Sequence, residues 1–197
     1  MQKTADNDFP ILDQLRQRWS PRAFSSRPVP PESVRSLFEA ARWAPSCFNA
    51  QPWRFIVAEQ ARDAEFAAAL TCLNEGNRGW AAAAPLLLFA VAQMQYENGS
   101  DNLHAFYDTG QAMACVCVQA TALGLFVHQM GGILFDLVRT TYALPDGFEP
   151  VCAAAIGYGG DVEALTDDVK KKERAPRERK PLSGMVFAGS WGQPAPL

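Results

Sequence analysis

The stretch AARWAPSCFNAQPWRFIV, residues 40–57, passes from one apolar periodicity to another through a polar loop. The run that leads into it, residues 30–44, has apolar side chains at helical spacing and opens with prolines, which suit a first helical turn. The run that leaves it, residues 53–59, alternates and is rich in aromatic and branched side chains, which predicts a strand. A helix that ends before Pro45 is therefore followed by a loop and a strand.

Three side chains with hydrogen-bonding groups, Ser46, Asn49 and Gln51, lie in this loop. Serine, asparagine and proline favour turns in any protein, so a plain turn explains them. Asparagine and glutamine also donate and accept hydrogen bonds at once, which suits the edge of a flavin or a nucleobase. The residues alone leave both interpretations open.

Periodicity predicts further elements on both sides of this stretch. They are a helix over 9–19 that Pro21 ends, a helix over 61–73, a buried strand over 85–93, a long helix over 101–123, a strand and turn over 127–133, a short helix over 135–145 and a buried strand over 149–160. The long helix is apolar enough for the middle of the molecule or for a subunit interface. Together these elements predict an α+β fold in one domain over residues 1–197, with a basic tail from about residue 161.

Composition limits the function classes. A length of 197 residues suits one compact domain, and a net charge of -3 argues against general nucleic-acid binding. Five cysteines without a Cys-x-x-Cys pair predict reduced thiols. The first residues lack an apolar signal segment, and the longest apolar run, residues 80–92, contains a proline and is shorter than the roughly 20 residues of a membrane span. We therefore expect a soluble cytoplasmic protein that does not bind a membrane.

Arginines gather in LRQRWSPRAF, residues 15–24, where Arg18 and Arg22 flank Ser20, and again near the C-terminus, where APRERKPL supplies Arg177 and Arg179. Guanidinium groups bind phosphate through two parallel hydrogen bonds, and serine adds a neutral donor. If these groups converge, they could hold one terminal phosphate monoester. A run such as KKKERAPRERK is equally typical of a solvated tail, so the charge pattern does not choose.

Several motifs in order along the chain resemble the nitroreductase family of FMN-dependent oxidoreductases. RWSPRAF is similar to the family's opening R-x-S-x-R-x-F, and APSCFNAQPW is close to its A-P-S-x-x-N-x-Q-P-W signature. GLFVHQMGGI and AIGYGG follow in the family's order, ahead of the basic tail. The resemblance implies a small central, mainly antiparallel sheet flanked by helices, and a homodimer with an extended C-terminal tail.

The resemblance also implies which residues hold a tightly bound FMN. The phosphate would bind to Arg18, Ser20 and Arg22, with Trp19 between them also among the cofactor-binding residues, and a tail pair would complete the contacts. Arg177 and Arg179 fit that pair, with Arg174 as an alternative.

The flavin ring would meet two further groups. Pro45, Ser46, Cys47 and Asn49 would approach it from the partner subunit, with Gln51 either in contact or bracing the loop. On the other side it would meet Gln129, Met130, Gly131 and Gly132, whose backbone supplies an N–H to flavin N5, and Asn77, with Asn74 as the alternative. Trp80 stands where some relatives carry a lysine.

The implied activity transfers a hydride from NAD(P)H to FMN and then reduces an electron-poor small molecule, a nitroaromatic or a quinone, in ping-pong fashion. No side chain is then required as acid, base or nucleophile, and Cys47 is interpreted as a small packing residue. His104 and His128 lack further ligands at suitable spacing, so we expect no metal. Reduction of another acceptor class on the same fold, or a module that only stores FMN, remain alternatives.

Overall fold

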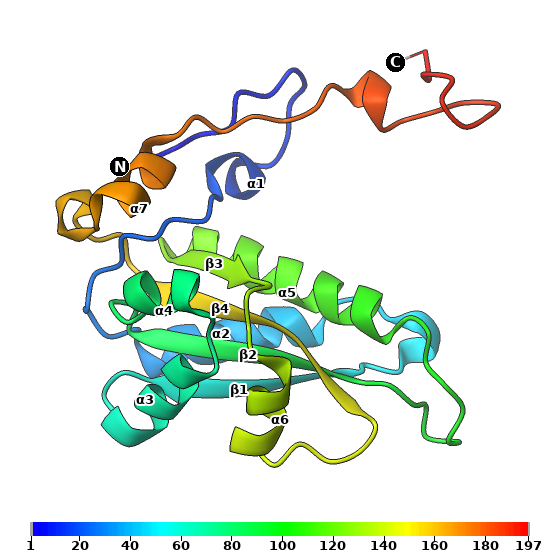
Figure 1. Ribbon diagram of the computed structural model, residues 1–197. Coiled ribbons are helices and arrows are strands. Elements are labelled where there is room, and N and C mark those ends of the chain that lie inside the picture. The colour runs from blue at the N-terminus through cyan, green and yellow to red at the C-terminus, as the bar shows by residue number, and fades with distance from the viewer. Residues whose placement is uncertain (1, 197) are drawn as a thin grey trace.

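The computed structural model of this chain describes residues 2–196 (Figure 1). Its strands are β1 (Trp53–Glu59), β2 (Leu86–Gln93), β3 (Phe126–Met130) and β4 (Phe148–Gly157). Its helices are α1 (Asp13–Gln17), α2 (Pro31–Arg42), α3 (Asp63–Thr71), α4 (Glu75–Ala81), α5 (Ala105–Ala122), α6 (Phe135–Thr141) and α7 (Asp167–Arg174), with single 3-10 turns at Cys47–Asn49, Val162–Ala164 and Leu182–Gly184.

The four strands form one antiparallel sheet in the order β1-β2-β4-β3. The two central strands are covered on both faces, which explains why β2 is a nearly continuous run of buried leucine, alanine, phenylalanine and valine. The alternating β1 is an edge strand, which is consistent with its partly exposed side chains. The α+β architecture with an antiparallel sheet is confirmed.

Helices cover the two faces of the sheet unequally. On one face α2 and α5 pack on the sheet through side chains such as Leu37, Met113 and Val116, which are all 1% exposed or less. On the other face α3, α4 and α6 pack through Phe66, Trp80 and Val138. Burying each large apolar side chain contributes about 1.5–3 kcal/mol to stability. The two cores therefore fix the sheet, the helices and the loops that these elements carry.

The structure corrects one predicted helix and adds detail on the long helix and the tail, for which the sequence left alternatives open. The first helix is only α1, because its apolar side chains find no core and Leu12 is 67% exposed. The long helix has a narrower buried stripe than its composition predicts, since Phe106 and Leu123 are exposed. The tail after residue 161 is not simply solvated: α7 forms there and packs against the body through Glu173. Helix α4, rich in glycine and asparagine, was not predicted.

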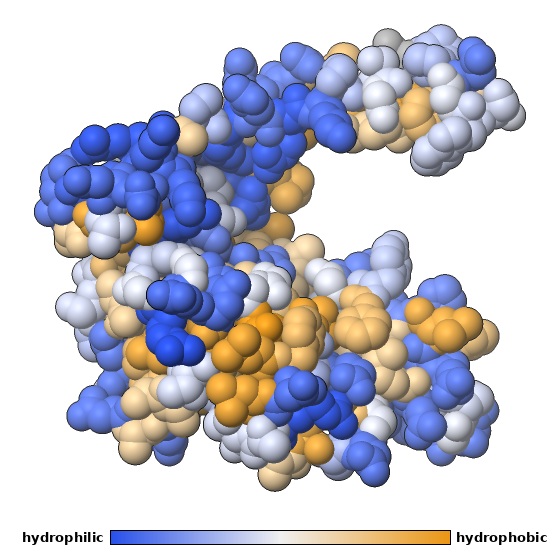
Figure 2. Space-filling view, viewed as in Figure 1, coloured by the Kyte–Doolittle hydropathy of each residue, from blue (hydrophilic) through white to orange (hydrophobic). Residues whose placement is uncertain are grey.

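Beyond α7 the chain leaves the body as an arm, residues 180–196 (Figure 1). The arm ends in a hook in which the Phe187 and Trp191 rings lie 5.0 Å apart, and Trp191 is 92% exposed. Figure 2 shows a deep recess between the arm and the body. Across residues 2–196, none of the helices is both long and apolar enough to cross a membrane.

Candidate functional site

The two arginine-rich stretches meet at one shallow basin of about 220 Å³. The N-terminal segment lies beside the last turn of α1, where Ala5 N donates to Arg16 O at 2.8 Å. The Arg177 guanidinium connects the tail to both segments by donating to Lys3 O and Arg16 O. The polar side chains that line the basin are Lys3, Arg18, Ser20, Arg22, Lys172, Glu173, Arg177 and Arg179. The five predicted phosphate contacts Arg18, Ser20, Arg22, Arg177 and Arg179 thus all lie on the wall together with the buried Trp19, and Lys3 and Lys172, which were not predicted, join them.

The segment that carries Arg18 and Arg22 is held by Glu173 of α7, which is 1% exposed. Its two carboxylate oxygens accept hydrogen bonds from Arg22 N at 3.0 and 2.9 Å, and one also accepts from Ala23 N at 3.2 Å. The Arg22 guanidinium stays 4.0 Å away. The carboxylate therefore satisfies backbone donors and leaves the arginine side chains free toward the basin. This residue was not predicted, because it is one of two glutamates, with Glu178, in the basic run over residues 170–180 and neither has a distinctive spacing.

The basin has more positive charge than its own residues neutralise. Over residues 2–196, Arg22 is the one basin cation that has a carboxylate within 4.0 Å. Burial lowers the pKa of Arg177, and neighbouring Arg18 and Arg179 lower it further. Burial also lowers the pKa of Lys3, with Glu173 opposing and Arg22 and Arg177 adding to the decrease. An anion in the basin would relieve this mutual repulsion.

Two further observations agree with an anion site. The Trp19 indole lines the basin, and its Nε1–H is buried with no hydrogen-bond acceptor among the described residues. Arg174, the alternative tail residue, turns away and pairs with Glu163. The tail contacts that face the basin are therefore Arg177 and Arg179.

Trp80 of α4 connects the basin to the sheet. Its ring lies 5.9 Å from the Arg22 guanidinium carbon, 4.5 Å from the His128 ring and stacks on Phe24. Burial lowers the pKa of His128 to about 4, so the imidazole is neutral near pH 7, and its Nδ1 lies 2.8 Å from Pro21 O. A neutral His128 thus supports the backbone between Ser20 and Arg22.

One turn before Trp80, Asn77 reaches the glycine pair that follows β3. Its Nδ2 donates to Gly132 O at 3.2 Å, and Asn74, which caps α4, donates its backbone N–H to the same oxygen at 3.1 Å. A Cβ at Gly132 would lie 2.4 Å from Asn74 Nδ2 and 2.7 Å from Asn77 Nδ2, so any other residue would displace these two amides. A Cβ at Gly131 would meet nothing within 4 Å, so the space beside this residue is open. We call this open space beside Gly131 and Gly132 the glycine notch.

The two residues before the glycines turn their side chains elsewhere. Met130 is buried in the core at 3% exposure. The Gln129 amide donates to Cys117 Sγ at 3.2 Å and lies 3.8 Å from Cys152 Sγ, on the α5 side of the sheet. Of the predicted contacts in residues 129–132, only the backbone and the two glycines are therefore available to a ligand at the notch.

The loop from Pro45 to Gln51 lies at the other end of α5. The Cys47 backbone N–H donates to Asp108 Oδ2 at 3.0 Å, whereas Gln129 beside the notch contacts Cys117, nine residues further along the helix. At 1.5 Å per residue, that separation is about 14 Å along the axis. Within one chain, this loop is therefore not part of the basin and the notch.

The loop is strained. Phe48, Asn49 and Gln51 have φ angles of 52°, 56° and 46°, in the left-handed region that non-glycine residues rarely adopt. Ser46 Oγ accepts from Gln51 N at 3.0 Å, and the Asp108 carboxylate, 2% exposed, anchors the loop to α5. Such strain often accompanies a functional loop. Asp108 was missed from sequence because an acid inside an apolar helix has no distinctive spacing.

No cluster of three or more potential metal ligands gathers among residues 2–196. All five cysteines are free thiols.

Comparisons with known proteins agree with this geometry. Residues 15–158 match the family described as Nitroreductase family. A solved structure described as an oxidoreductase containing FMN superposes with a TM-score of 0.89 at 35% identity, covering 94% of this chain and 95% of that one. A 15.4 kDa protein of Mycolicibacterium smegmatis, itself uncharacterized, is 33% identical over 72% of this chain and 99% of its own length. The nitrobenzene nitroreductase of Ectopseudomonas oleovorans is 36% identical over 36% of this chain and 32% of its own length.

The fold, an antiparallel sheet flanked by helices, is the fold of a class of oxidoreductases. Because the family match covers most of the chain, the protein belongs to the Nitroreductase family.

Proposed function

We propose that this chain is an FMN-dependent oxidoreductase that takes a hydride from NADH or NADPH and reduces an electron-poor acceptor of the nitroaromatic or quinone type. The observation that carries the proposal is the basin of unpaired cations, joined through Trp80 to the open notch at Gly131. A phosphate monoester would find paired donors in the basin, and the edge of a flat ring would find room at the notch. FMN carries both groups in one molecule, and the solved oxidoreductase containing FMN supports the choice.

The residues of this chain would hold FMN in defined ways. Arg18, Ser20 and Arg22 would bind the phosphate, with Arg177 and Arg179 closing over it. The Asn77 amide nitrogen is used by Gly132 O, which leaves its oxygen to accept from a ring N–H. When bound, FMN would supply the hydride chemistry and serve donor and acceptor in turn, which gives ping-pong kinetics. No side chain is assigned as acid, base or nucleophile.

We further propose that the working form is a homodimer. The strained loop with Asn49 lies at the far end of α5, so a second copy is needed to bring it to the flavin. Large apolar side chains are exposed in and before α1, in the strained loop, at the start of α5 and on the arm, and that copy would cover them. They are Phe9, Ile11, Leu12, Leu15, Phe48, Leu103, Phe106, Tyr107, Leu182, Met185 and Trp191. Covering apolar surface contributes about 25 cal/mol per Å².

The visible spectrum of the purified protein, recorded before and after anaerobic addition of NADH or NADPH, tests this function. We expect an oxidised flavin band that bleaches with a donor and returns when a nitroaromatic or a quinone is added. A band that stays oxidised with both donors would contradict the reductase and favour a flavin-storage module. A protein that stays colourless after incubation with FMN would contradict flavin binding. Return of the band only with a halogenated, aldehyde or enone acceptor would assign another reductase class.

A further inference from the structure

A cleft of about 740 Å³ lies between the strained loop and the connection from β2 to α5. Its volume falls in the range of roughly 300–1,000 Å³ that is typical of small-molecule sites. One wall is residues 48–52, and the other is residues 93–102. Neither the phosphate basin nor the glycine notch contributes to it.

The cleft contains a buried donor without an acceptor. Asn102 is 1% exposed, and its Oδ1 accepts from His104 N at 3.1 Å, which fixes the orientation of the amide. The Nδ2 group has no hydrogen-bond partner among the described residues. Buried polar groups in native structures are almost always paired, so this donor indicates an acceptor supplied from outside.

The other lining groups restrict what the occupant can be. Gln95 and Asn49 offer amide donors and acceptors, and Phe48 and Tyr96 form an edge-to-face pair at 6.0 Å with Phe48 almost fully exposed. The guanidinium of Arg54 is used by Gln93 Oε1, Gln51 O and Trp53 O, so it is not free to hold a phosphate. The cleft therefore favours a neutral flat ring whose edge alternates donors and acceptors.

We propose that this cleft binds the adenosine half of the nicotinamide electron donor. Adenine presents an N–H₂ donor beside ring-nitrogen acceptors, which is the edge that Asn and Gln amides recognise. A nitroaromatic or a quinone presents acceptors only and would leave the amide oxygens unpaired. The inference rests on the proposed function, in which the loop with Asn49 reaches the flavin of the partner. The nicotinamide would lie at that flavin, and the adenine would lie behind the loop.

Two variants test the cleft in the FMN-loaded protein. Asn102→Asp keeps the acceptor for His104 N but removes the orphan donor, and Gln95→Leu changes an exposed amide. Rapid mixing without oxygen gives the rate of flavin reduction by NADH and by reduced nicotinamide mononucleotide, which lacks the adenylate. We expect NADH to be at least about tenfold better in the unchanged protein, and each variant to lose roughly five- to tenfold with NADH only, the effect of one or two hydrogen bonds.

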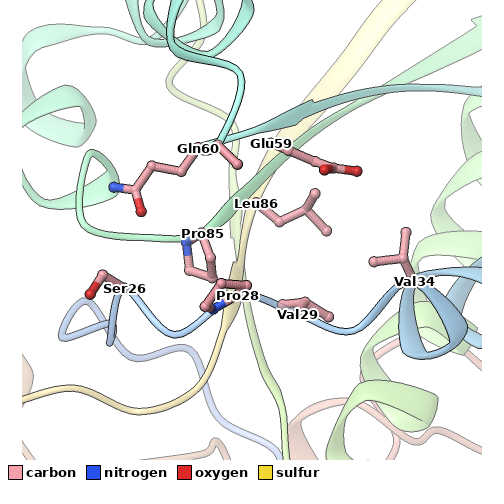
Figure 3. A pocket seen from close by; sticks show the side chains of 9 residues that line it. Ser26, Pro28, Val29, Val34, Glu59, Gln60, Pro85 and Leu86 are labelled. Atoms are coloured by element: carbon pink, nitrogen blue, oxygen red, sulfur yellow. The ribbon is translucent and has the colours of Figure 1, made fainter.

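A matched control lies at the opposite end of β2. There a second cavity of about 260 Å³ is lined by Gln60, Pro85 and Leu86 (Figure 3). Gln60→Leu makes the same chemical change as Gln95→Leu and should leave both donor rates unaltered.

Equal rates with the two donors in the unchanged protein, or an NADH advantage that survives both variants, would overturn the proposal. A change in the acceptor KM alone would assign the cleft to the acceptor and also overturn it. If neither donor reduces the flavin, the proposed function fails, and calorimetry with AMP decides the cleft separately. AMP binding that is lost in Asn102→Asp would support the adenosine site, and absence of AMP binding by the unchanged protein would contradict it.

Discussion

Two loops of this protein are each held by one buried carboxylate, and the two arrangements differ. Glu173 accepts three hydrogen bonds from the backbone beside Arg22, at a basin full of unpaired cations. Asp108 accepts one from Cys47 N, at a loop with three left-handed residues. The basin is built from one chain, whereas the loop presents Phe48 and Asn49 to solvent. The proposed function therefore assigns a ligand to the first region and a partner subunit to the second.

The largest expected effect breaks the basin. The double variant Arg18→Ala/Arg22→Ala removes two charge-assisted donors, each worth about 1.5–3 kcal/mol, so the Kd for FMN should rise at least about 100-fold. Flavin fluorescence during titration of the apoprotein measures this. Arg42→Ala, which removes an exposed arginine paired with Glu39, is the control and should change nothing. An unchanged Kd in the double variant would contradict the phosphate assignment.

Two truncations separate the basin from the arm. A chain that ends after Pro176 loses Arg177, Arg179 and the arm, and should bind FMN about 10- to 100-fold more weakly. A chain that ends after Pro181 keeps both arginines but loses Trp191, so its dimer should weaken more than its flavin binding. Analytical ultracentrifugation and flavin titration measure the two effects. If the chain that ends after Pro176 sediments and retains flavin like the full chain, the tail contributes to neither the dimer nor the phosphate site.

Much of the fold follows from local patterns, and the places where prediction failed share one cause. The apolar runs of β2 and of the second half of β4 predicted two buried strands, whereas the antiparallel arrangement was expected from the family resemblance. The convergence of Arg18, Arg22, Arg177 and Arg179 was expected from the family resemblance, because the charge pattern alone fits a solvated tail equally well. Glu173 and Asp108 were not predicted, because the value of a buried acid depends on backbone donors from distant segments. The helix α7 was not predicted within the basic tail for the same reason.

Acid pH should destabilise the packing of the segment beside the basin that His128 supports. The pKa of His128 in the folded state is lowered to about 4 from 6.5, so the unfolded chain binds more protons between these values. The stability that depends on neutral His128 is complete above pH 6.5 and is lost as pH falls to 4. Each pKa unit is worth about 1.4 kcal/mol, so the free energy of unfolding should decrease by up to about 3 kcal/mol.

Urea unfolding of the apoprotein at several pH values measures this loss. His128→Asn keeps a donor near Pro21 O and cannot titrate, so its pH dependence over this window should be flatter by that amount. His104→Asn changes the exposed histidine at the start of α5, near the strained loop, and should keep the slope of the unchanged protein. Equal slopes in His128→Asn and the unchanged protein would contradict a neutral His128.

The smallest effect compares the two carboxylates directly. Glu173→Gln leaves one acceptor for the N–H groups of Arg22 and Ala23 and should lower the free energy of unfolding by about 1–3 kcal/mol, with weaker FMN binding. Asp108→Asn still offers an oxygen to Cys47 N, so it should cost about 1 kcal/mol and leave the FMN phosphate contacts intact. Glu163→Gln, in an exposed ion pair, is the control. Because Glu173 acts on the basin and Asp108 on the loop, only Glu173→Gln should move the Kd for FMN in the chain that ends after Pro181, measured at a concentration where ultracentrifugation finds monomers. Equal Kd shifts in both variants would mean that the loop contributes to the phosphate site within one chain.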